Sequence, residues 1–372
     1  MRVESVEMRD FRSYERAKAS LGAGLTVVHG PNGAGKSNLL EAVYFGCTGR
    51  SPRTRNDREL VRFGSAAARV TVRLTDEGDP HELTVGYAAP APGSPAVKRM
   101  SSDGARVERM LDVPARPLIS VFLPERLELV KGPPSARRAH LDQLLAALWP
   151  ARAEVVREYG RILAQRNALI GRIRSGRSSQ AALGAWDLEL ARAALELRDR
   201  RAEAVALLAE PFAARAVELG LAGEPALRYR PRTEAAGAEE LAAELRERLA
   251  GDLERGYTGH GPHRDELALL RDGRELRTYG SQGEQRLALL ALLLAERALL
   301  ASLRGRTPLM LLDDVMSELD ASRRELLVRE LSDAGQSVIA ATELAHVPGA
   351  GDASVSRLAV TPGTVVQEAA GT

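Results

Sequence analysis

Eight residues near the start of the chain constrain its fold more than any other stretch. They read Gly-Pro-Asn-Gly-Ala-Gly-Lys-Ser and match the phosphate-loop pattern G-x-x-x-x-G-K-[ST]. A strand pattern, Leu25–Val28, precedes them, and a helical pattern begins inside them at Lys36. A strand, a glycine-rich turn and a helix start gather backbone N–H groups and the positive end of the helix dipole around one point. The stretch therefore predicts an α/β fold that binds a triphosphate through Gly30, Pro31, Asn32, Gly33, Ala34, Gly35, Lys36 and Ser37.

Two side chains of this loop have specific expected roles. We expect Lys36 to reach the β- and γ-phosphates and the Ser37 hydroxyl to bind Mg²⁺. Only four of the 52 basic residues in the chain are Lys. Where a chain uses Arg almost everywhere, a Lys at this position indicates that the compact ammonium is needed there. The alternative is a glycine turn that binds no ligand.

A second part of the site is indicated near the C-terminus. Residues 308–312 form an apolar run without polar alternation, which is typical of a parallel strand buried on both faces. Two carboxylates, Asp313 and Asp314, end this run. Asp313 suits a Mg²⁺-associated position, and Asp314 could orient or deprotonate the attacking water. The alternative is that the two aspartates only begin a turn.

The stretch Tyr279–Arg286 opens a long apolar helix. Ser281 and Glu284 have the spacing of a capping box, which puts the helix start at Ser281. A cap does not explain Gly283, because glycine in a first turn costs about 1 kcal/mol relative to alanine. Close approach of an anion would explain it, and taken alone the segment supports both interpretations equally.

The hydrophobic pattern divides the chain into three parts. We expect an ATPase lobe over 1–132, a helical lobe over 133–252 and the rest of the ATPase lobe over 253–372. Glycines and a proline interrupt the helical part, so it predicts a compact lobe. A long coiled-coil arm would need sustained heptads.

The turn Gly259–Glu266, which leads into a strand pattern, allows two interpretations. His260, His263 and Asp265 could form a metal site. The glycines and the proline favour a tight turn instead.

Composition excludes several classes of protein. The longest apolar stretch, Leu287–Leu300, contains Glu296 and Arg297 and is too short to span a membrane. We expect no signal peptide, because the N-terminal stretch is charged. One cysteine, Cys47, rules out an internal disulfide and fits a reducing cytosol. The formal net charge is +2, so any contact with nucleic acid must come from a local patch.

The order of these parts resembles the ABC-type ATPase head of DNA repair proteins, and within that group the RecF family. The resemblance covers nearly the whole chain. The motifs that carry it are Phe11–Tyr14, Gly30–Ser37, Phe122–Glu125, Leu129–Gly132, Gly261–Asp265, Ser281–Arg286 and Leu311–Asp320.

This resemblance implies mixed sheets around the phosphate-loop helix, with an inserted helical lobe. It implies a cytoplasmic bacterial protein that forms a homodimer with ATP and Mg²⁺, binds duplex and gapped DNA, and works with RecR and RecO to load RecA. Lys36, Asp313 and Asp314 would be the catalytic residues. The resemblance also implies that one subunit meets the nucleotide bound by its partner through Ser281, Gln282, Gly283 and Asp320.

Three positions depart from the pattern of transporter-type ATPases. Asp314 is one methylene shorter than the usual glutamate, no glutamine lies near Glu125, and no switch histidine falls at Thr342 or Glu343. We therefore expect slow hydrolysis, with ATP acting as the ligand that closes a clamp.

Contacts with DNA are expected from arginines that bind phosphates, because no helix-turn-helix, zinc finger or aromatic platform is evident. One candidate segment carries Arg50, Arg53, Arg55 and Arg58, and the other is the arginine-rich stretch 151–180. Solvated helix faces are the alternative for both.

Two other classes of protein were weighed. The head of an SMC-type chromosome complex would need long heptad arms, for which this chain has no room. A metabolic kinase would not explain the segment at Ser281, and a transporter ATPase would normally carry the switch histidine.

Overall fold

The computed structural model describes residues 1–90, 94–333 and 335–368. The chain forms two compact units, one made of Met1–Arg126 with the chain from Leu300 onward and the other of Leu127–Leu299. We expected the helical lobe to end at 252. The second unit continues further because β9 (Pro225–Arg230) pairs with β10 (Glu266–Arg271) across that boundary.

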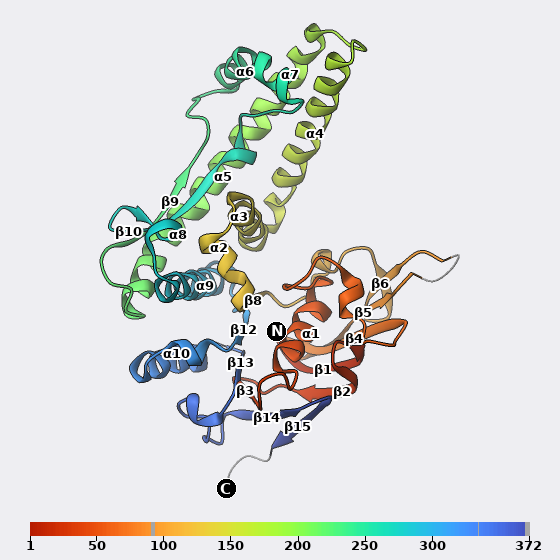
Figure 1. Ribbon diagram of the computed structural model, residues 1–372, viewed down its shortest axis with the longest axis vertical. Coiled ribbons are helices and arrows are strands. Elements are labelled where there is room, and N and C mark those ends of the chain that lie inside the picture. The colour runs from red at the N-terminus through yellow and green to blue at the C-terminus, as the bar shows by residue number, and fades with distance from the viewer. Residues whose placement is uncertain (91–93, 334, 369–372) are drawn as a thin grey trace. The chain divides into compact units, whose positions relative to one another are not determined.

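A largely parallel sheet organises the first unit (Figure 1). Its order is β15-β14-β3-β13-β12-β8, and only β15 runs antiparallel to its neighbour. Every residue of β12 and β13 is buried, which confirms that the apolar runs form strands covered on both faces. The bounds are β3 (Leu25–His29), β8 (Ile119–Phe122), β12 (Leu309–Asp313), β13 (Ser337–Ala341), β14 (Ser356–Thr361) and β15 (Thr364–Glu368).

An antiparallel sheet forms the second layer of this unit, in the order β2-β1-β4-β5-β6-β7. Its first four strands largely alternate between buried apolar and more exposed polar residues, so one face of the sheet is apolar and the other is polar. The bounds are β1 (Arg2–Phe11), β2 (Tyr14–Ser20), β4 (Ala67–Asp76), β5 (Asp79–Ala88), β6 (Val97–Ser102) and β7 (Ala105–Val107).

Helix α1 (Lys36–Thr48) lies between the two sheets and contacts strands of both. Ten of its 13 residues are buried, including Cys47. At Gly46, a Cβ atom would come within 2.5 Å of Val72, so a glycine is needed for the helix to approach the sheet this closely. The core between the sheets therefore fixes the helix that follows the phosphate loop. Helix α10 (Ala321–Asp333) also belongs to this unit, and its Leu327 and Leu331 are buried.

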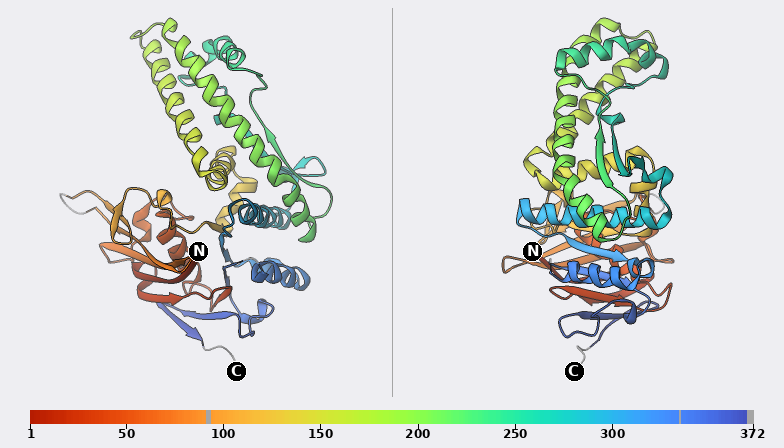
Figure 2. Two further views of the ribbon diagram at one scale, coloured as in Figure 1. Left: turned by 180° about the vertical axis from the view of Figure 1, so that it is seen from behind. Right: turned by 90° about the vertical axis from the view of Figure 1, so that its left-hand side faces the viewer.

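The second unit is mainly helical. Two long helices, α4 and α5, pack side by side (Figure 2). Helix α5 has 36 residues and continues through Pro211, so it is longer than the broken pattern led us to expect. The bounds are α2 (Glu128–Lys131), α3 (Pro134–Leu148), α4 (Glu154–Arg174), α5 (Leu183–Glu218), α6 (Ala238–Glu247), α7 (Leu249–Arg255), α8 (Leu276–Tyr279), α9 (Gln282–Arg304) and β11 (Arg274–Glu275).

A buried ion network joins three of these helices. The Arg166 side chain, which is fully buried in α4, donates to Asp187 of α5 at 2.8 Å and to Asp252 of α7 at 2.9 Å. Breaking a buried pair of this kind typically costs about 3 to 5 kcal/mol, because one charge is left uncompensated. The network therefore fixes how the helices of this unit pack.

In the turn before β10, the side chains of His260, His263 and Asp265 form hydrogen bonds with residues of the same unit. The alternative interpretation, that these three residues form a metal site, is therefore wrong. His260 Nε2 lies 2.5 Å from Glu244, and His263 Nδ1 lies 2.6 Å from the Tyr159 hydroxyl. Asp265 accepts bonds from a tyrosine hydroxyl and a backbone N–H. Within the described residues, no three His, Cys, Asp or Glu side chains are grouped to hold a metal ion.

The helices of the described ranges include none that combines the length and the apolar character needed to cross a membrane.

Candidate nucleotide-binding site

The phosphate loop connects β3 to α1 and has the backbone shape of an anion cradle. Gly30, Gly33 and Gly35 all have positive φ, at 146°, 79° and 119°. Side chains at two of these positions would also collide with the fold, since a Cβ on Gly30 would come within 2.1 Å of the Val360 carbonyl oxygen. For Gly35 the nearest atom would be the Tyr14 hydroxyl at 2.8 Å.

The start of α1 lacks the usual partners of a helix N-terminus. Gly35 is the N-cap residue, no side chain caps the first turn, and that turn contains no acidic residue. The first N–H groups of a helix have no partner within the helix and carry partial positive charge. An anion bound by the loop would satisfy them.

The Lys36 ammonium lies back over the loop. It donates to the Gly30 carbonyl at 2.7 Å and to the Pro31 carbonyl at 3.0 Å. Burial lowers the pKa of Lys36, and the negative charges of Asp313 and Asp314 oppose this shift. A partly desolvated ammonium whose partners are neutral carbonyls is well suited to bind phosphate oxygens.

The predicted Mg²⁺ ligands lie together. Asp313 is the last residue of β12 and is 7% exposed, and the Ser37 hydroxyl lies close enough to its carboxyl to lower its pKa. Burial raises the pKa of the Asp313 carboxyl, while Ser37 and the charge of Arg53 lower it. A hydroxyl and a carboxylate oxygen are the hard ligands that Mg²⁺ prefers, so this pair fits the ion.

Asp314 adopts a strained backbone conformation at the end of the strand. Its φ is 51°, and its N–H donates to the Ala340 carbonyl at 3.1 Å. Aspartate tolerates this left-handed region better than most residues, although it costs about 1 kcal/mol or more. The Asp314 side chain is exposed and short, so the backbone conformation fixes the direction of its carboxylate.

Helix α1 also carries a buried carboxylate that our sequence interpretation missed. Glu41 is fully buried and accepts two bonds from the Arg12 guanidinium, at 2.8 and 2.7 Å. The Ser51 hydroxyl donates to it at 2.5 Å and Arg53 at 3.3 Å. A lone glutamate in the otherwise apolar run from Leu39 to Val43 is the signal that could have revealed it.

Arg53 lies in this site rather than in an open basic patch. Its guanidinium donates to Asn38 at 3.1 Å and to Glu125 at 3.3 Å, besides Glu41. Burial opposes its charge, but these carboxylates and Asp313 raise its pKa overall. An Arg53 contact with DNA would have to break these bonds.

The other arginines expected to contact DNA differ in whether they are exposed or paired with acidic residues. Arg50, Arg55 and Arg58 are exposed. In the stretch 151–180, by contrast, several arginines bond to acidic residues of the same unit. The pairs are Arg157 with Glu154, Arg161 with Glu158, and Arg166 with Asp187 and Asp252.

The start of α9 has the predicted capping box. The Ser281 N–H donates to Glu284 at 2.8 Å, and the Glu284 N–H donates to the Ser281 hydroxyl at 3.3 Å. Ser281, Gln282 and Gly283 are exposed. A Cβ on Gly283 would meet nothing within 4 Å, so packing within the chain does not require a glycine there. Close approach of an outside group would require one.

Asp320 caps its own helix. Its carboxylate accepts from the Arg323 N–H at 2.9 Å and from the Ser322 hydroxyl at 2.8 Å, and it is exposed. The backbone bond from Arg323 is the main reason why its pKa is lowered. Transporter-type ATPases carry a switch histidine just after this last core strand, where this chain has Thr342. A histidine is nevertheless close by, because the Thr342 hydroxyl lies 3.3 Å from His346 Nδ1.

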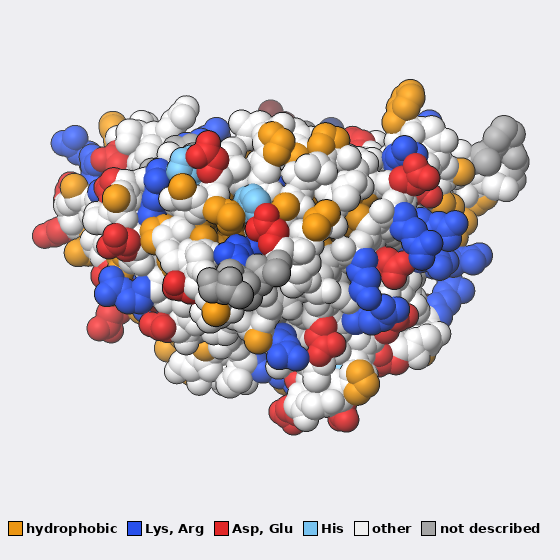
Figure 3. Space-filling model, turned by 90° about the horizontal axis from the view of Figure 1, so that it is seen from below, with side chains coloured by type: hydrophobic (Ala, Val, Ile, Leu, Met, Phe, Trp, Pro, Cys, Tyr) orange, Lys and Arg blue, Asp and Glu red, His pale blue; other side chains and the backbone are white. Residues whose placement is uncertain are grey.

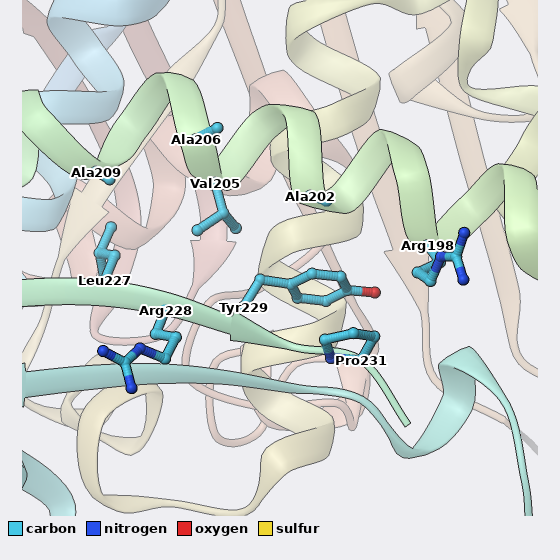
Figure 4. Close-up of a pocket in the computed structure, with 9 residues that line it drawn as sticks. All are labelled: Arg198, Ala202, Val205, Ala206, Ala209, Leu227, Arg228, Tyr229 and Pro231. Atoms are coloured by element: carbon cyan, nitrogen blue, oxygen red, sulfur yellow. The ribbon is translucent and has the colours of Figure 1, made fainter. Parts of the chain in front are cut away.

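A cavity of about 370 Å³ in the second unit has a different character (Figure 4). It lies between α5 and β9 and is lined mainly by apolar side chains such as Val205 and Leu227, with Arg198 and Arg228 also in its lining. It has neither a glycine-rich turn nor a carboxylate in its lining, so it does not compete with the phosphate loop as a nucleotide site.

Comparison with known proteins identifies the family of the chain. The model of an AAA domain matches residues 5–98. A DNA replication and repair protein RecF from Acidothermus cellulolyticus is 39% identical over 352 residues, covering 91% of this chain and 93% of that protein. Another from Heliobacterium modesticaldum is 36% identical and covers 93% of both chains. This chain belongs to the RecF family.

Solved structures agree with this assignment. One described as the recombination mediator protein RecF with ATP in the RecFOR pathway has a TM-score of 0.86, 26% identity and coverage of 99% of this chain and 98% of that one. An SMC head bound to the winged-helix domain of ScpA has a TM-score of 0.61 at 16% identity, which shows a shared fold. The expected ABC-type ATPase head with an inserted helical lobe is therefore confirmed, as is the resemblance to RecF.

Proposed function

We propose that this RecF-family protein is an ATP-gated DNA-binding protein of recombinational repair and replication. The observation that carries the proposal is the uncapped start of α1, which follows three positive-φ glycines and lies beside Lys36 and the Ser37–Asp313 pair. This arrangement fits a triphosphate with its cation better than any other chemistry at the site.

The residues have separate roles in this proposal. The loop from Gly30 to Gly35 binds phosphate oxygens through its backbone, and Lys36 neutralises the β- and γ-phosphates. Ser37 and Asp313 would hold Mg²⁺, which would supply positive charge to the phosphates. Asp314 positions the attacking water. Because Asp314 is short and depends on a strained backbone, the protein is a weak ATPase that uses hydrolysis as a switch.

Two copies close around the nucleotides. The exposed first turn of α9 supplies Ser281, Gln282 and Gly283 to the γ-phosphate held by the partner subunit, with Asp320 nearby. Only ATP has that phosphate, so ATP and not ADP favours the dimer.

The closed homodimer binds duplex or gapped DNA and acts with RecR and RecO in loading RecA in the bacterial cytoplasm. Arg50, Arg55 and Arg58 are candidate contacts with DNA.

Nucleotide binding is tested with Lys36→Met and a fluorescent ATP analogue. We expect Lys36→Met to weaken binding by about 10- to 100-fold, because a charge-assisted bond contributes about 1.5 to 3 kcal/mol. Lys131→Met is the matched control, since Lys131 is exposed in the other unit. Equal affinity in the Lys36 and Lys131 variants would contradict the assignment of the loop.

A further inference from the structure

Four arginines form one row across the polar face of the antiparallel sheet. The strand registers put Arg16 opposite Arg9 and Arg9 opposite Arg69. Gly86 stands opposite Arg69 on one side and opposite Arg99 on the other. The row crosses five neighbouring strands, a width of about 19 Å at the usual strand spacing. We call Arg9, Arg16, Arg69 and Arg99 the arginine row.

The row does not stabilise the sheet. Like charges that face each other across neighbouring strands are destabilising. Among the described residues, Arg9, Arg69 and Arg99 have no ion pair or side-chain hydrogen bond, and Arg16 lies 3.9 Å from Glu7. Elsewhere on the same face, the Arg73 side chain does bond to the opposite glutamate at 3.1 Å. All four arginines of the row are exposed, which leaves their charge available to a ligand.

Gly86 gives a second, independent indication. It lies inside β5, in an unbroken register with β4 and β6, and its φ is not positive. A Cβ there would meet only the Ala68 carbonyl oxygen, at 3.8 Å, so packing does not require a glycine. Glycine inside a strand costs about 0.5 to 1 kcal/mol, and it is often found where another molecule approaches the backbone closely.

The rest of the face indicates what kind of molecule approaches. The next row contains Lys18, Arg106 and three hydroxyl side chains, all of which can donate to phosphate oxygens, together with one carboxylate, Glu7, which lies 3.9 Å from Arg16. No aromatic residue points outward from these strands, so the face lacks a platform for stacking unpaired bases. Figure 3 shows Lys and Arg side chains gathered toward the side on which β1, β2, β4 and β5 lie in Figure 1.

The geometry points to this face as a docking surface for the sugar-phosphate backbone of duplex DNA. The arginine row binds successive phosphates, and Gly86 leaves room for the backbone to lie close against the sheet. This inference rests on the proposed DNA binding and gives it a location on a rigid sheet, in addition to the segment with Arg50, Arg55 and Arg58.

A triple variant, Arg9→Gln with Arg69→Gln and Arg99→Gln, tests the inference in the full-length protein with ATP and Mg²⁺. Binding to a labelled duplex is measured by fluorescence anisotropy over a range of salt concentrations. We expect at least about 10-fold weaker binding and a salt slope reduced by about 3, one for each lost phosphate contact. The matched control, with Arg192, Arg232 and Arg329 changed to Gln, removes the same charge from exposed positions outside both candidate DNA segments and should keep the wild-type affinity.

Two further measurements separate docking from folding. The row variant should melt at the wild-type temperature or above it, because like-charge repulsion is removed. Gly86→Val should also fold stably, since valine favours strands, yet it should weaken binding to the duplex. Loss of melting stability in both variants together with lost binding would indicate a structural role and overturn the inference.

The outcomes also distinguish this inference from the proposed function. If the wild type does not bind duplex with ATP, the proposed DNA binding fails and the inference fails with it. If the wild type binds and the row variant keeps its affinity and salt slope, only the inference is overturned. It is also overturned if the row variant loses binding to vesicles of anionic lipid or to single strands while its binding to duplex is unchanged.

Discussion

At the scale of single residues, Glu41 joins the phosphate-loop helix to the segments on either side of it. A fully buried carboxylate that accepts from Arg12, Ser51 and Arg53 holds two guanidinium groups, and that of Arg53 lies close enough to Asp313 to lower its pKa. Removing one partner of a buried pair leaves the others uncompensated. We therefore infer that Glu41 is a positioning residue, which holds Arg53 beside the proposed nucleotide site.

We expect Glu41→Ala to lower the free energy of unfolding by about 3 kcal/mol, because both guanidinium groups lose their buried partner. Urea unfolding at neutral pH measures this. The control is Glu15→Ala, since the Glu15 side chain is 76% exposed and pairs only with Arg62 on the surface. That change should cost less than about 0.5 kcal/mol, and equal losses in the two variants would refute the role of Glu41.

At the scale of elements, the sequence patterns correctly predicted those features that depend on interactions between residues close in the chain. The phosphate loop, the buried strands β12 and β13 and the capping box before α9 each depend on residues close in sequence. The pairing of Arg53 with Glu125, 72 residues away, could not be predicted in this way. The arginine row also stayed hidden, because it exists only once five strands have found their register.

The turn before β10 provides a pH test of its structural role. Burial lowers the pKa of His263, and the bond to the Thr258 carbonyl offsets only part of this shift. The folded protein therefore keeps His263 neutral where the unfolded chain would protonate it. Its contribution is fully present above about pH 6.5, the value for an unfolded histidine, and is lost as the pH falls toward the lowered pKa of the folded state.

Between about pH 7.5 and 5.5, wild-type stability should fall more steeply than that of His263→Gln, by at most about 1.4 kcal/mol per pH unit. Chemical unfolding at several pH values measures both slopes. The bonds of His263 to Tyr159 and Thr258 make the variant less stable at neutral pH, so only the change with pH is compared. Parallel curves for the two proteins would show that His263 does not titrate on unfolding.

At the scale of the whole molecule, the proposed dimer would build each nucleotide site from the first unit of one copy and the second unit of the other. The first unit carries the phosphate loop with Ser37 and Asp313, and the second carries the exposed start of α9. Neither the capping box nor the core of its own unit accounts for Gly283. A phosphate held by a second copy would explain it, and we therefore propose the homodimer as the state that binds DNA.

Sedimentation velocity with Mg²⁺ and either ATP or ADP tests the ATP-dependent dimer most directly. The proteins compared are the wild type, Ser281→Arg and a control, Ser179→Arg, because Ser179 is also exposed in the second unit. We expect the wild type and the Ser179 variant to be dimers with ATP and monomers with ADP. We expect Ser281→Arg to stay a monomer with both nucleotides. A wild type that is monomeric with ATP, or a Ser281→Arg variant that dimerises normally, would contradict the proposed ATP-dependent dimer.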